Sequence, residues 1–302
     1  MALGSNHLTI TSQANMIPEI WVDEVRAYLM ANLVMAKLVK NFMFEGRKGD
    51  TLHVPDVTEL TANAKAANTA VTFNSNVEGV FDLSINNHTE CSVMIEDIAA
   101  IQASYDLRSI YTKAIGYALA KKIDSDLWTL QSGLGNRYVA GSNGAWTTAA
   151  NAVSASGQNV TAGISLTETA IRKAIERLDT ANAPDDGGRF LAIPPTEKNS
   201  LLAIPRFTEY QMLGPGGMPI RSGQFGEIFG LPVYVTTQAC VVSTAVTSLV
   251  MHRDAFAIAI QSSPRVQAGY VIDFLGTALV GDVIYGFAEF RDNHAIAMFT
   301  AR

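Results

Sequence analysis

Cysteine is nearly absent from the sequence, with two in 302 residues, Cys91 and Cys240. The two lie far apart and match neither a disulfide framework nor a paired-cysteine metal site, which indicates a reducing intracellular setting and buried thiols. No stretch reaches the roughly 18 consecutive apolar residues that a membrane span requires, and the N-terminus has neither the basic start nor the apolar run of a signal peptide. We therefore expect no membrane partner and no export.

Positive charge is also scarce. Lys and Arg number 22 against 28 Asp and Glu, which gives a net charge of -6. Because proteins that hold nucleic acid by charge need a clustered excess of Lys and Arg, we expect any contact with DNA to be weak or indirect. The hydrophobic content of 48% is ample for a packed core in one large domain or two ordinary ones.

Catalytic and metal-binding motifs are missing as well: there is no nucleophile elbow, zinc-protease helix, Walker loop or dinucleotide-binding glycine pattern. No lysine or capped helix follows Gly214, Gly216 and Gly217, so they indicate a loop. The letters HRD at 252–254 match a kinase catalytic loop, but Ala259 stands where that loop needs Asn. Five histidines are scattered without the spacing of metal ligands: His7, His53, His88, His252 and His294. We expect no catalytic residue, no cofactor and no metal.

One segment is marked by its helical periodicity. Apolar residues recur three and four apart at Leu107, Ile110, Tyr111, Ala114, Ile115, Ala118, Leu119, Ile123, Leu127 and Leu130. Asp106 can cap the start and Gly133 can end it, so the pattern predicts an amphipathic helix of about 25 residues and roughly 37 Å. Such a helix is about twice the usual length, which favours a structural spine.

Before this helix the sequence predicts a polar arm, a helix from Pro18 to about Asn41, and strands near 51–57, 77–86 and 91–97. We interpret these strands as one long hairpin. Residues 61–70 between them have no large apolar side chain, which fits either a surface loop or an arm that packs on another molecule.

After the helix, residues 165–238 predict a compact α/β unit. It begins with a capping box at Ser165 and Glu168, followed by a helix to about Pro184. A buried strand at 189–193, a short helix at 196–204 and a glycine-punctuated turn into a strand at 233–236 complete it. The last 60 residues predict strands that end in a hairpin. A sheet formed there would cover the apolar stripe of the long helix, so the α/β unit is predicted to be inserted into a discontinuous domain.

This order of elements resembles the major capsid protein of tailed double-stranded DNA phages, with the Hong Kong 97-type fold. The wording that carries the resemblance is "PEIW", "GDTLHVP", "GYALAKKID", "GEIFGLPVYVTTQ" and "MHRDAFAIAI". The resemblance covers nearly the whole chain and implies an α+β fold. Its parts are an N-terminal arm and helix (1–48), an extended β-hairpin loop (49–98), a peripheral domain with the spine helix (99–160 and 245–302) and an inserted axial α/β domain (161–244).

The resemblance implies a structural protein that self-assembles into pentamers and hexamers of an icosahedral head enclosing double-stranded DNA. It places the protein in the virion, with assembly in the bacterial host cytoplasm. The implied partners are further copies of the chain, a portal protein, a decoration protein in some relatives, and packaged DNA by non-specific contact. About 15 polar residues precede the first predicted helix, so we expect a separate scaffolding protein. Some relatives cross-link lysine to asparagine; Lys65 is the only lysine near the loop tip, and its partners stay unassigned.

Two alternatives stay open from the sequence. An encapsulin-like bacterial nanocompartment shares the implied fold. An unrecognised α/β enzyme would have its site in the inserted unit, where Asp185, Asp186 and Arg189 form the conspicuous polar cluster. The same three residues also fit a solvated turn before the strand at 189–193.

Overall fold

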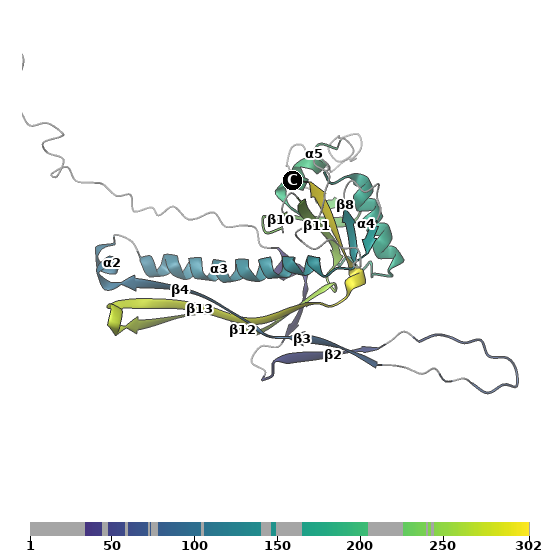
Figure 1. Ribbon diagram of the computed structural model, residues 1–302, viewed down its shortest axis with the longest axis horizontal. Helices are drawn as coiled ribbons and strands as arrows, with labels where there is room; N and C mark the ends of the chain where they lie inside the picture. The colour runs from purple at the N-terminus through teal and green to yellow at the C-terminus, as the bar shows by residue number, and fades with distance from the viewer. Residues whose placement is uncertain are drawn as a thin grey trace, which may run out of the picture.

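The computed structural model describes residues 34–43, 48–57, 60–71, 73, 78–103, 106–139, 146–148, 165–204, 226–239, 241–242 and 245–301. Helices and strands are mixed, as the predicted α+β class requires. Two main sheets and a protruding two-stranded hairpin carry the fold, and a long helix lies beside one of the sheets (Figure 1). Among these residues no helix is both long and apolar enough to cross a membrane.

The long helix is present as predicted. Helix α3 spans Leu107–Thr129, and a 3-10 turn, Leu130–Ser132, follows it. The Asp106 carboxylate accepts hydrogen bonds from the backbone N–H groups of Arg108 and Ser109, at 3.1 and 3.4 Å, so this residue caps the helix. At 1.5 Å per residue the 23 helical residues measure about 35 Å.

Helix α3 lies along a four-stranded sheet that we call the spine sheet (Figure 1). Its strands, in spatial order, are β1 (Lys40–Met43), β12 (Phe256–Val271), β13 (Gly276–Glu289) and β4 (Asn87–Glu96). Ile115, Leu119 and Ile123 are buried against it, whereas Tyr111 and Ala118 are exposed. The apolar stripe is therefore narrower than predicted, because a sheet covers only one side of a helix.

Strand pairing differs from the predicted hairpins in two places. The segment near 91–97 does not continue the long hairpin, because β4 pairs with β13 from Asn87↔Tyr285 to Glu96↔Gly276. The predicted closing hairpin is also wrong, since β14 (Ala295–Ala301) pairs with β11 (Ala245–His252) in the other sheet. Alternation identifies a strand and its two faces but carries no information about its partner.

The second sheet has eight strands. Its order is β6 (Trp146–Thr148), β5 (Asn136–Val139), β14, β11, β7 (Arg189–Ile193), β9 (Leu231–Val235) and β8 (Glu227–Ile228), with β10 (Val241–Val242) paired to β11. Both faces are covered. Leu191 and Ile193 pack with helices α4 (Glu168–Thr180) and α5 (Pro195–Leu202), whereas Phe190 and Ala192 pack with the C-terminal end of α3. This two-sided burial explains why β7 is a continuous apolar run.

The α4 boundary corrects one prediction. The capping residue is Thr167, whose hydroxyl accepts a hydrogen bond from the Ala170 N–H at 3.3 Å, and not Ser165. The Leu166 N–H, just before the cap, donates to the Glu197 carboxylate at 2.7 Å. The predicted apolar face holds, with Ala170, Ala174 and Leu178 buried.

The N-terminal helix is shorter than predicted in the part that the structure describes. Helix α1 covers only Met35–Leu38, and Lys40–Met43 forms β1, parallel to β12. Asp124 of α3 is fully buried and accepts a hydrogen bond from the Met35 N–H at 2.7 Å, which fixes α1 on the spine helix. Burial raises the pKa of Asp124, and hydrogen bonds from the backbone of Met35, Ala36 and Val34 act against the rise. The predicted part at 18–33 lies outside the described residues.

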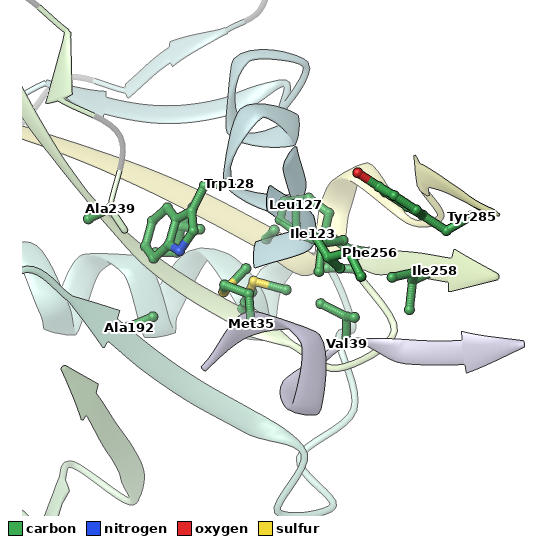
Figure 2. Close-up of a cluster of buried hydrophobic side chains, with 14 of the residues drawn as sticks. Met35, Val39, Ile123, Leu127, Trp128, Ala192, Ala239, Phe256, Ile258 and Tyr285 are labelled. Carbon is green, nitrogen blue, oxygen red and sulfur yellow. The ribbon is translucent and has the colours of Figure 1, made fainter. Parts of the chain in front are cut away.

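The core where the two sheets meet contains the C-terminal end of α3. Figure 2 shows Leu127 and Trp128 of this helix near Met35 and Val39 of the α1 segment, with Phe256 beside them. All five side chains are buried. The spine helix is thus anchored at this end, whereas its N-terminal half lies on the spine sheet far from the second sheet (Figure 1).

Candidate assembly surfaces

The hairpin of β2 (Thr51–Val57) and β3 (Glu78–Ser84) extends away from both sheets (Figure 1). Its base is anchored in a small core with Leu83 and Ile85 buried beside Ala257 and Ala259. Phe81 packs edge-to-face on Phe290, with ring centroids 5.0 Å apart. An isolated two-stranded hairpin is only marginally stable in water, so its outer part depends on the anchored base or on another molecule.

The loop of this hairpin, which we call the arm loop, comprises the described residues 60–71 and 73. Every one of them is exposed, including Leu60, Val71 and, at 91%, Phe73. Residues 61–70 pack against no core, as predicted. They contain no large apolar side chain that could be buried. The three apolar side chains that flank this segment are available to a partner.

The far end of the spine sheet carries a second apolar surface, which we call the tip surface. It combines the short helix α2 (Asp97–Gln102) with the turn between β12 and β13, including a 3-10 turn at Ile272–Phe274, and both lie at the same end of the molecule (Figure 1). Its six exposed members are Ile98, Ile101, Tyr270, Ile272, Phe274 and Leu275. Ile101 and Ile272 are 82% and 76% exposed. Large apolar side chains gathered in this way mark interaction sites on soluble proteins.

The tip surface is held in a defined shape. The Asp97 N–H donates to the carbonyl of Leu275 at 3.0 Å, and the Tyr270 hydroxyl donates to Asp97 Oδ2 at 2.8 Å. This last hydrogen bond raises the pKa of Tyr270. The two segments are thereby joined across the sheet edge, so a partner meets a preformed surface.

Sequence reasoning missed the tip surface. The predicted strand ends near 97, and no prediction assigns Ile101 or 272–275 to a surface. The signal in the sequence was the letters "IDFLG" at a position where a turn between strands is usually polar. This signal alone does not predict a surface, because the sequence does not show that α2 lies beside the turn.

In the cluster of Asp185, Asp186 and Arg189, where an enzyme would have its site, the contacts are structural. The Arg189 guanidinium is buried and donates to Asp179 at 2.6 Å and to the carbonyls of Ala183 and Pro184, so it closes the C-terminal end of α4. Asp186 instead accepts from the Gly188 N–H and pairs with His252 at 2.9 Å. These contacts keep the pKa of Asp186 below its usual value. Asp185 is exposed, and Asp186 and Arg189 bind different partners.

Two of the histidines, His252 and His294, pack edge-to-face with ring centroids 5.9 Å apart, and the other two described histidines pair with aspartates. His252 is buried, and its Nδ1 accepts from the Asp254 N–H at 3.2 Å, so the residues that match the kinase motif form a turn between β11 and β12. His53 pairs with Asp82 and His88 with Asp282, both on the surface. In the described part of the chain no three His, Cys, Asp or Glu side chains are grouped as metal ligands. His7 lies outside the described residues.

The remaining predictions concern a glycine turn, the two cysteines, three further glycines and Lys65. Phe229 and Gly230 adopt positive φ angles of 51° and 77° between β8 and β9, which confirms a glycine-dependent turn there. Cys91 is a free thiol that is only half-buried, which corrects the expected full burial at this position. Cys240, Gly214, Gly216 and Gly217 lie outside the described residues, and Lys65 is an exposed member of the arm loop.

A comparison with protein families matches residues 91–293, more than half of the chain, to a model described as phage capsid protein. No curated protein matches the chain. A solved structure from Mycobacterium phage Che8 superposes with a TM-score of 0.76 at 21% identity, covering 94% of this chain and 97% of that one. The capsid structure of cyanophage P-SCSP1u gives a TM-score of 0.76 at 18% identity, covering 99% and 97%. At these identities the structures establish the shared fold.

Proposed function

The chain belongs to the phage capsid protein family, and from this membership we propose that it is the major head subunit, which packs as pentamers and hexamers into an icosahedral shell around double-stranded DNA. The family and its structural neighbours are shell proteins and not enzymes, so the protein is a structural capsid protein with the Hong Kong 97-type fold. Its place is the virion capsid.

The observation that carries the assembly proposal is the pair of apolar surfaces at opposite ends of an elongated subunit. The tip surface lies at one end of the spine sheet, and the arm loop lies at the opposite end of the molecule (Figure 1). A subunit with separate contact surfaces can meet several neighbours at once, and repeated identical contacts close a symmetric shell. Each contact can be modest while the whole shell is stable.

We propose the domain division stated above as the working description, with residues 1–48 as the N-terminal arm and helix, 49–98 as the extended loop, 99–160 with 245–302 as the peripheral domain and 161–244 as the axial domain. The pairing of β4 with β13 places the strand part of 87–96 in the spine sheet. A division of 49–98 after Ser84 therefore fits the hydrogen bonding better.

A scaffolding protein, a portal and packaged DNA are proposed partners, with assembly in the bacterial cytoplasm. DNA contact is proposed to be non-specific, because the net charge of -6 gives no overall attraction to phosphate. The nanocompartment alternative shares the fold, but the family description and the two neighbouring structures named above are of phage proteins.

Negative-stain electron microscopy and sedimentation of the purified full chain, with and without a co-expressed scaffold, test the proposal. We expect closed shells, or rings of five and six subunits. Uniform closed shells without scaffold would show that no separate scaffolding protein is needed. A compact monomer under every condition would refute the assembly proposal.

A further inference from the structure

A cleft of about 580 Å³ lies where the α1–β1 segment meets the second sheet. Backbone hydrogen bonds hold its walls together, because the Lys40 N–H donates to the carbonyl of Arg253 and the Arg253 N–H donates to the carbonyl of Gly188, both at 3.0 Å. The cleft is therefore preformed in the subunit, and its volume falls within the roughly 300–1,000 Å³ that small-ligand sites occupy. We call it the α1 cleft; it is lined by residues 37–41, 186–190, Pro232, Tyr234 and 253–254.

Positive charge gathers in the α1 cleft, although the whole chain has a net charge of -6. Two of its four cationic side chains are already paired. Lys40 Nζ lies 3.3 Å from Asp254 Oδ1, and Arg189 is used at the end of α4. The other two, Lys37 and Arg253, are exposed, and neither side chain has an ion pair or hydrogen bond within the described part of the chain. Both remain open to a ligand of negative charge.

The loop before β7 contributes a backbone donor and one carboxylate. Gly187 has a left-handed backbone with a φ of 80°, and its N–H makes no hydrogen bond to another described residue. Asp186 Oδ1 accepts from the Gly188 N–H and from Nε2 of the buried His252, both at 2.9 Å. No Lys or Arg of the described residues pairs with this carboxylate. After pairing, two cations therefore remain against one carboxylate, and the cleft keeps an excess of positive charge.

An aromatic side chain completes the lining. Tyr234 of β9 is 36% exposed, and its ring packs edge-to-face on the buried Phe190 of β7, with ring centroids 6.1 Å apart. This contact orients the Tyr234 ring and leaves part of it open to the cleft. Exposed aromatic rings beside positive charge are the surfaces on which nucleotide bases stack.

We propose that the α1 cleft binds a nucleoside phosphate, with Lys37, Arg253 and the Gly187 N–H around the phosphate group and the Tyr234 ring against the base. One guanidinium fork satisfies a carboxylate, whereas a phosphate group has more oxygens and accepts from several donors. Two cations, a backbone donor and an aromatic ring together therefore favour a phosphate joined to a base over an acidic peptide. The phosphate comes either from a free nucleotide or from a DNA strand, and the contacts are the same for both. The cleft lies within one subunit, so this inference does not depend on shell assembly.

Isothermal titration calorimetry of the full chain tests the proposal with four probes: deoxyadenosine monophosphate, inorganic phosphate, a single-stranded deoxyadenosine oligonucleotide and hexaglutamate. We expect saturable binding of the mononucleotide, and binding about tenfold weaker when Lys37→Gln is combined with Arg253→Gln, because two charged donors are lost. Arg108→Gln combined with Lys113→Gln removes the same charge from exposed positions of α3 and should bind as the wild type does. Sedimentation confirms that all three proteins have the same assembly state.

Tyr234→Leu tests the stacking contact, since leucine keeps apolar bulk and lacks the ring. We expect the mononucleotide to bind about fivefold more weakly to this variant, with the affinity for inorganic phosphate unchanged. Tighter binding of the oligonucleotide than of the mononucleotide, with the difference lost in the cleft double variant, identifies a DNA strand as the source. Equal affinities for the two identify a free nucleotide.

Absence of saturable binding for both the mononucleotide and the oligonucleotide would overturn the proposal. So would undiminished binding in the cleft double variant, an equal loss in the α3 double variant, or an unchanged mononucleotide affinity in Tyr234→Leu. Binding of hexaglutamate without binding of the mononucleotide would assign the cleft to an acidic protein segment instead. If the cleft double variant does not fold, Lys37→Gln and Arg253→Gln are measured singly, and each is expected to weaken binding by about threefold.

Discussion

At the scale of single residues, buried polar side chains join segments that are distant in sequence. Glu197 of α5 is 1% exposed and accepts hydrogen bonds from the Leu166 N–H at 2.7 Å and from the Thr300 hydroxyl at 2.5 Å. It thereby connects α5, the start of α4 and the last strand. Nothing in the letters "PTEKNSLL" distinguishes this glutamate from a surface one.

Replacing Glu197 by alanine is expected to lower the free energy of unfolding by about 3 kcal/mol, because the buried N–H and hydroxyl lose a charged acceptor and a cavity forms. Urea unfolding followed by circular dichroism measures the loss. Glu176→Ala, on the exposed side of α4, is the matched control and should change stability by less than about 0.5 kcal/mol. Equal effects at the two positions would contradict the role given to Glu197.

A glycine sets how closely the spine helix approaches its sheet. At Gly281 of β13 a Cβ atom would collide with the Cγ2 methyl of Ile115 and would lie 3.3 Å from Leu119. Gly281→Ala is expected to destabilise the protein by about 1–3 kcal/mol through overpacking. Gly269→Ala in β12, where nothing lies within 4 Å, provides the control, and its melting temperature should stay at or slightly above that of the wild type. A neutral Gly281→Ala would show that Ile115 can move aside.

At the scale of elements, α3 is long because its stability comes from tertiary packing and from its Asp106 cap. Tyr285 of β13 strengthens the contact with the sheet, since its hydroxyl donates to Asp126 of α3 at 2.5 Å. Burial, followed by this hydrogen bond, raises the pKa of Tyr285 to about 12, so the donor keeps its proton at all ordinary pH values.

Gly116 of α3 lowers the stability of the helix, and no contact among the described residues requires a glycine there. A Cβ atom at Gly116 would meet nothing within 4 Å, so alanine fits there. Gly116→Ala is expected to stabilise the protein by about 0.5–1 kcal/mol, because glycine has the larger conformational entropy to lose in a helix. A rise in the urea midpoint with an unchanged slope is the expected result. A fall in the midpoint would mean that Gly116 serves a purpose outside the isolated subunit, such as close approach of a neighbour.

At the scale of the whole molecule, the tip surface is expected to act between subunits and not within one. Ile272→Asp introduces a charge where, in the proposed shell, an apolar side chain is buried against a neighbour. We expect the folded subunit to keep its melting temperature, whereas the concentration needed for assembly rises by tenfold or more, which corresponds to about 1.4 kcal/mol at one contact. Light scattering against protein concentration measures this change.

Asn199→Asp adds the same charge to the exposed side of α5 and should assemble as the wild type does. If Ile272→Asp assembles normally while Asn199→Asp does not, the contact lies on the second sheet's side of the molecule and the tip surface has another use.

The sequence by itself determined the elements whose signals are local. The cap at Asp106, the spacing of the α3 apolar residues, the strand-forming composition of β11 to β14 and the glycine turn at Gly230 each act within a few residues, so each could be predicted. The order of these elements was enough for the resemblance to a capsid protein, which the family comparison confirms. Local patterns also excluded the catalytic and kinase motifs.

Only the tertiary structure decided which strands pair and which polar residues are buried. Strands β13 and β14 are neighbours in sequence, yet they lie in different sheets because the chain crosses at 290–294. Glu197 is buried because β14 lies in the second sheet, where its Thr300 hydroxyl donates to the Glu197 carboxylate. The tip surface forms because β4 pairs with β13, which brings α2 beside the β12–β13 turn. Pairing and desolvation depend on contacts between distant segments, and such contacts leave no periodic trace in the sequence.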